Sequence, residues 1–166
     1  MKDFFKRMIG AASMNANTYE DVEADPSSSV GAIVIVLLSS VAGAIGSGVL
    51  DPLGILGATV AFLITWLVWV GLTFFIGTRL LPGPETRSSF GEILRTTGFS
   101  ATPGILRILG LLPNGIGLPI FLGVTVWMLF TFVIAIRQAL DYSSTGRAVA
   151  VCILGWLIHS LLFLAF

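Results

Sequence analysis

Four long apolar runs constrain this chain more than any other feature. They cover residues 30–50, 53–77, 116–136 and 148–166, and about 20 apolar residues in a helix are enough to cross a bilayer. Of the 166 residues, 55% are hydrophobic and only 11% are charged, whereas about a quarter are charged in a soluble domain. The sequence therefore predicts an all-α polytopic membrane protein.

A fifth apolar stretch, residues 98–113, decides the topology. It is short, it contains Pro103 and it carries Arg107. Ser89 and Glu92 have the spacing of a capping box, so a helix can begin near Phe90, and Pro103 then kinks or breaks it. Two halves over residues 90–112 would cover about 34 Å at about 1.5 Å per residue. We therefore expect a Pro-broken third span and a five-span helical bundle.

The placement of the cations favours five spans. If residues 90–112 cross, eight cations fall on one side, whereas the two loops on the other side, around Asp51 and Asn114, contain no Lys or Arg. The positive-inside rule then predicts a cytoplasmic N-terminus and an external C-terminus. The eight are Lys2, Lys6, Arg7, Arg79, Arg87, Arg95, Arg137 and Arg147.

Residues 1–29 are expected to form a cytoplasmic part ahead of a membrane domain at 30–166. At its start, charged residues alternate at helical spacing with the apolar residues Phe4, Phe5, Met8, Ile9 and Ala12. This pattern is typical of an amphipathic helix in the membrane interface, with its basic side toward anionic headgroups. It fits equally well a helix packed on the cytoplasmic face of the protein.

The next segment is acidic. Thr18 is expected to cap one short helix, and Asp25 a second helix with Pro26 at its first position. Glu20, Asp21, Glu23 and Asp25 do not share one helical face, so they are expected to be solvated or paired with arginines. The sequence predicts no metal site.

Small residues mark the first run as a packing helix. Ser39, Gly43 and Ser47 repeat at four-residue intervals, as do Ala42 and Gly46. Such stripes let helix backbones approach closely, either inside one chain or between two copies.

Two polar residues within the spans are candidate ligand or interhelix sites. Arg107 lies about five residues, roughly 8 Å, from the outer end of its span. It could snorkel to a headgroup, pair with a group such as Asp51, or handle a substrate or ion. His159 is the only histidine, and a packing role is favoured over a proton relay.

The remaining chemistry argues against catalysis. General acid–base work needs paired groups within hydrogen-bond reach, and the sequence predicts no catalytic residue and no cofactor. A single cysteine, Cys152, excludes an intramolecular disulfide and a cysteine metal cluster. The net charge of zero offers no basic patch for nucleic acid.

The loop at residues 137–147 is expected to form an ion-pair corner that meets the acidic segment. Asp141 lies there between Arg137 and Arg147. A docking surface for a cytoplasmic partner is the functional alternative. Its candidate residues are Tyr19, Glu20, Glu23, Asp25, Arg137, Asp141 and Arg147.

Four segments together resemble the prokaryotic branch of the YIP1 family of integral membrane proteins. They are MIGAASMNANTYEDVEAD, GTRLLPG, GEILRTTGFSATPGILRILGLLP and RQALDYSSTGRAVAVCILGW. The resemblance implies a five-span bundle with a cytoplasmic N-terminus, in a prokaryotic cytoplasmic (inner) membrane. Eukaryotic members are non-enzymatic factors that bind Rab-type small GTPases and one another. This chain lacks their long N-terminal region and its Asp-Leu-Tyr-Gly-Pro type motif, so the resemblance does not imply binding of small GTPases here.

Two functions follow as hypotheses. The first is a non-catalytic scaffold, membrane-organising factor or accessory subunit, whose partners are membrane lipids and either other membrane proteins or further copies of itself. The alternative is a carrier or channel for a small solute, ion or lipid, because discontinuous helices often form substrate sites.

Overall fold

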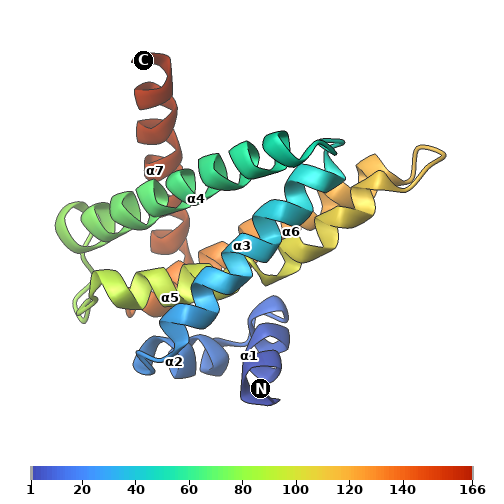
Figure 1. Cartoon of the computed structure of the whole chain (residues 1–166). Coiled ribbons are helices and arrows are strands. Elements are labelled where there is room, and N and C mark those ends of the chain that lie inside the picture. Colours follow the sequence, from blue (N-terminus) through green and yellow to red (C-terminus); the bar gives the residue numbers. More distant parts are fainter. Residues whose placement is uncertain (1, 166) are drawn as a thin grey trace.

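The protein is an assembly of helices (Figure 1). The computed structural model describes residues 2–165, and no strand occurs among them. In chain order the elements are α1 (Lys2–Ala12), α2 (Ala16–Ala24), α3 (Ser28–Gly46), α4 (Pro52–Phe75), the π-helix η1 (Ile76–Leu80), α5 (Phe90–Ser100), the 3₁₀ helix η2 (Thr102–Leu111), α6 (Gly117–Ala139) and α7 (Thr145–Ala165).

Three of the described helical segments are long and apolar enough to cross a membrane. They are Ser28–Gly46, Pro52–Leu80 and Gly117–Ala139, and Thr145–Ser160 is a shorter apolar helix. Many large hydrophobic side chains on these helices face outward, for example Leu38, Ile64 and Leu129. Such an exterior suits a lipid solvent. The chain is therefore a multi-pass membrane protein.

The segment from α5 to η2 is broken as the sequence predicts. The capping box is confirmed, because the Ser89 Oγ accepts from the Glu92 amide at 3.3 Å while the Ser89 amide donates to Glu92 Oε2 at 2.7 Å. Helix α5 ends at Ser100, and Pro103 lies in the first turn of η2. At about 1.5 Å per residue in α5 and about 2.0 Å in η2 the two halves measure roughly 36 Å.

Helix α5 lies at the centre of the assembly, in contact with α2, α3, α4 and α6. Ile93 and every residue from Arg95 to Ser100 are buried. Gly98 permits the contact with α3, since a β-carbon there would lie only 2.5 Å from that of Ala32. Helix α5 is thus interior to the fold, whereas η2 exposes Leu106, Ile108 and Leu109.

Helices α1 and α2 pack against the rest of the chain and close one end of it (Figure 1). The rings of Phe4 and Phe99 meet edge to face at 6.1 Å, and the Trp127 Nε1 donates to the Ala12 carbonyl at 2.8 Å. The expectation that Thr18 caps a helix is wrong. Helix α2 begins three residues earlier than this expectation, at Ala16 with Asn15 at its N-cap, and Thr18 packs against Gly10 of α1 instead.

The expectation that Asp25 caps the next helix, with Pro26 at its first position, is wrong in its bounds: α3 begins at Ser28 with Ser27 at its N-cap, and Asp25 lies in the turn before it. Its carboxylate accepts a hydrogen bond from the Ser27 amide at 3.0 Å, which is the contact that an N-cap side chain makes. Arg7 pairs with the same carboxylate at 2.5 Å, so α1 is tied to the start of α3.

Candidate functional site

Arg107 is buried where η2 crosses α3. Its side chain is only 9% exposed. Nη2 donates to the Ser39 carbonyl at 2.9 Å and to the Ser39 Oγ at 3.4 Å, and Nε donates to the Gly104 carbonyl at 3.4 Å. The guanidinium is therefore held by oxygen dipoles of the protein.

Two aromatic rings complete the surroundings of this cation. The Arg107 Cζ lies 5.3 Å from the ring centroid of Phe62 on α4 and 5.7 Å from that of Phe121 on α6. Within about 6 Å a ring face attracts a cation. Asp51, the partner considered from the sequence, instead caps α4 by accepting from the Gly54 amide at 2.6 Å.

Small residues make the crossing possible. A β-carbon on Gly43 would lie 2.7 Å from the Arg107 Nη2, and one on Gly46 would overlap the Arg107 backbone carbonyl. Ser39 and Gly43, expected from the stripe, are buried at this contact. Ser47 is not, because α3 ends at Gly46 and Ser47 is exposed beyond it.

His159 lies elsewhere, half-buried on α7 with its ring 5.9 Å from that of Trp69. Trp69 and Phe62 are seven residues apart on α4, which is about 10 Å along the helix. Arg107 and His159 thus contact the same helix two turns apart, and the described contacts do not bring them into one site.

The last turn of α6 meets the acidic helix α2, though not through the expected ion pairs. The Gln138 Nε2 donates to Glu20 Oε1 at 3.0 Å. Arg137 donates to the Tyr142 carbonyl and Arg147 to the Pro82 carbonyl, each at 3.2 Å. Over residues 2–165 the structure contains one ion pair, Arg7–Asp25, so the predicted Asp141 pairs are wrong: backbone carbonyls take up the two arginines.

Tyr19 does not belong to the surface proposed from the sequence. Its side chain is fully buried, and its hydroxyl donates to the Ala11 carbonyl at 2.9 Å and the Thr131 carbonyl at 3.3 Å. This hydroxyl joins α1, α2 and α6. Glu20 and Asp141 remain exposed, with Glu23 and Asp25 partly covered.

Arg95 is the buried cation that sequence reasoning passed over. It is 8% exposed, and its Nε donates to the carbonyls of Val22 and Glu23, both at 3.1 Å. These carbonyls end α2, where a cation also favours the helix dipole. The sequence signal that could have identified Arg95 is that a charged residue follows on the helix that the Ser89–Glu92 capping box begins.

Burial raises the pKa of Glu23 to about 7, from an ordinary value near 4.5. The carboxylates of Asp141 and Glu92 raise it further, and Arg95 opposes them. Hydrogen bonds from Ser27 and Arg7 hold the pKa of Asp25 below its usual range. Among the residues described, no group of three or more His, Cys, Asp and Glu side chains could hold a metal ion.

Two cavities border α1, and neither is lined by Arg107 or His159.

The chain matches the family model of the Yip1 domain over residues 13–166. No curated protein and no solved structure matches it.

Proposed function

Because the chain belongs to the Yip1 family, we propose that it is a non-catalytic scaffold, membrane-organising factor or accessory subunit of a membrane complex. The observation that carries this proposal is that Arg107, where η2 crosses α3, already has its partners within the protein. In carriers, broken helices leave backbone or side-chain dipoles free for the substrate. Here the Arg107 guanidinium is bonded to Ser39 and flanked by Phe62 and Phe121.

The proposal includes five spans, formed by α3, α4 with η1, α5 with η2, α6 and α7. The close contact of Gly46 with η2 puts the ends of α3 and of η2 side by side. The loops beyond both ends contain no Lys or Arg. Arg95 and Gln138, in contrast, contact α2 at the other end. With the positive-inside rule, this supports a cytoplasmic N-terminus and an external C-terminus. The proposed location, a prokaryotic inner membrane, rests on the resemblance alone.

The proposed partner surface combines α2 with the end of α6 and the loop that follows it. Its members are Glu20, Glu23, Asp25, Arg137, Asp141 and Arg147. The Glu20–Gln138 contact makes these segments continuous. Their mixed charges suit another membrane protein or a second copy of this chain.

Crosslinking in the native membrane, followed by purification in mild detergent, tests this function. A defined partner or homo-oligomer is expected, and it should be lost when Glu20 and Asp141 are both changed to Lys. Glu85→Lys, an exposed change in the loop before α5, is the matched control and should retain the complex. A strictly monomeric protein without a partner would overturn the proposal.

One feature favours the alternative of a carrier or channel. A 3₁₀ helix of ten residues such as η2 exceeds the usual three to four and often marks a functional hinge. Reconstituted vesicles would then show a solute flux that Arg107→Leu abolishes. A flux retained in Arg107→Leu, or no flux in the parent protein, excludes this alternative.

A further inference from the structure

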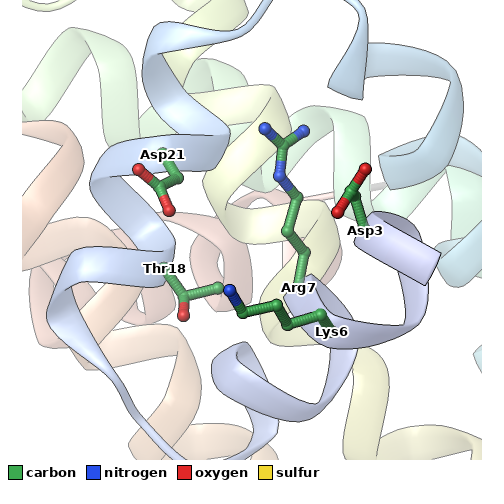
Figure 2. A pocket seen from close by; sticks show the side chains of 5 residues that line it. All are labelled: Asp3, Lys6, Arg7, Thr18 and Asp21. Atoms are coloured by element: carbon green, nitrogen blue, oxygen red, sulfur yellow. The ribbon is translucent and has the colours of Figure 1, made fainter.

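A polar cavity of about 150 Å³ lies between α1 and α2. Figure 2 shows the side chains of Asp3, Lys6 and Arg7 from α1 beside those of Thr18 and Asp21 from α2. The two helices come together where Thr18 packs on Gly10. The cavity therefore has two walls with fixed spacing.

The cavity has equal numbers of positive and negative side chains, and most of them have no ion-pair partner among the described residues. Two cations and two carboxylates line it. Arg7 donates hydrogen bonds from its Nη1 to Asp25 and Ser28. Lys6, Asp3 and Asp21 form no ion pair with any described residue. A ligand that carries both a phosphate and an ammonium group would complement both signs.

A second cavity, of about 170 Å³, shares Arg7 with the first. It is lined by Phe4, Arg7, Ser27, Ser28, Gly31 and Phe99. Its walls are aromatic side chains and the first turns of α3, the first candidate span. A polar cavity and an aromatic one thus adjoin where a membrane helix begins, and this arrangement matches an amphiphile.

The outer face of α1 also suits contact with lipid. Phe5 and Ile9 are 58% and 69% exposed, and the exposed Lys2 and Lys6 are on the same helix. Exposed aromatic and aliphatic side chains next to lysines are typical of helices in the headgroup region.

We propose that the two cavities bind one phospholipid with a primary ammonium headgroup, of the phosphatidylethanolamine type. Its phosphate accepts hydrogen bonds from Lys6 and from the N–H groups that Arg7 does not spend on Asp25. Its ammonium donates to Asp21. The glycerol end lies by Ser27 and Ser28, and the chains continue past Phe4 along α3, with the buried Phe99 ring beneath them.

The headgroup chemistry separates this lipid from its competitors. A choline headgroup has no N–H to donate, and a glycerol headgroup leaves the carboxylates facing a net negative lipid. One charge-assisted hydrogen bond lost corresponds to about a tenfold difference in affinity.

The test uses the full chain in detergent micelles with defined lipids, read by native mass spectrometry and by the shift in melting temperature. Phosphatidylethanolamine should be retained about tenfold better than phosphatidylcholine or phosphatidylglycerol. Free phosphoethanolamine, which lacks the chains, should bind far more weakly. Lys6→Gln should lower retention of the ethanolamine lipid, and Asp21→Asn should remove its advantage over phosphatidylglycerol. Lys2→Gln, on the same helix but outside the cavity, should change neither.

Equal retention of the three lipids would overturn the proposal, as would equal effects of Lys6→Gln and Lys2→Gln. Tight binding of free phosphoethanolamine would also overturn it, since the site would then be one for a soluble metabolite. Lys6 and Asp21 are both exposed, so their variants should fold. The comparison of lipids on the parent protein decides the question without them. None of these outcomes bears on the partner complex, so failure here is distinguishable from failure of the proposed function.

Discussion

The Arg107 guanidinium donates to the backbone carbonyl of Ser39 at 2.9 Å, across the contact between η2 and α3. Because the Ser39 carbonyl belongs to a helix, the bond supplements the backbone ladder. A charge that would be costly in lipid is therefore placed inside the protein, where it holds η2 against α3.

Changing Arg107 to Ala should lower stability without affecting any transport. It removes a charge-assisted hydrogen bond and the contacts with Phe62 and Phe121, together worth about 2 kcal/mol. A fluorescence-based melting curve in detergent would measure the loss. Arg107→Lys should recover only part of it, since an ammonium cannot lie flat between two rings. A melting temperature unchanged in Arg107→Ala would contradict this structural role.

Gly46→Ala should be strongly destabilising because its β-carbon would overlap the Arg107 carbonyl. Overpacking against backbone costs about 2–3 kcal/mol. Gly57→Ala is the matched control on α4, where a β-carbon meets nothing within 4 Å. It should be neutral or stabilising by about 0.5–1 kcal/mol, because Ala favours a helix over Gly. Equal melting temperatures for the two variants would refute the close crossing.

The sequence predicts the parts of this crossing that depend on local patterns. The capping box at Ser89 and the break at Pro103 follow from single residues whose backbone requirements are specific. Burial is different, because it depends on which helices meet. The sequence predicts Tyr19 as a surface residue in a polar segment, yet its hydroxyl donates a hydrogen bond to the backbone carbonyl of Thr131, far along the chain.

Tyr19→Phe should loosen α2 from α6. The variant keeps the ring but leaves the carbonyls of Ala11 and Thr131 without this donor, at a cost of about 1–2 kcal/mol. Limited proteolysis within residues 13–27 would report it as faster cleavage. Tyr142→Phe serves as the control, because its hydroxyl bonds to Gly77 and Leu81 at a different contact. Cleavage as slow in Tyr19→Phe as in the parent would count against the buried hydroxyl.

Glu23→Gln should stabilise the protein near pH 8, by about 1 kcal/mol after allowance for solvent screening. The pKa of Glu23 is raised in the folded state, to about 7 from near 4.5, so folding favours its protonated form. That favourable contribution is complete below about pH 4.5 and is lost as the pH rises through about 7. Melting temperatures of the two proteins should therefore converge toward pH 4.5. A constant difference across this range would be inconsistent with the raised pKa.

The contact between Arg95 of α5 and Glu23 of α2 shows why the place of a charged residue in the fold is hard to predict from sequence. Arg95 looks like one more cation for a topology count. In the folded chain it ends α2 by bonding the Val22 and Glu23 carbonyls. The same limit applies to Arg137 and Arg147, whose backbone partners carry no signature in the sequence.

In the proposed five-span arrangement, α5 and η2 together cross the membrane. Single cysteines at Pro113 and Ser143, in a Cys152→Ser background, test it with a thiol reagent that cannot cross the bilayer, applied to intact cells and to lysed cells. A crossing in the proposed orientation predicts that Pro113→Cys is labelled in intact cells and Ser143→Cys only after lysis. Labelling of Ser143→Cys in intact cells, with Pro113→Cys protected, would contradict this crossing with a cytoplasmic N-terminus.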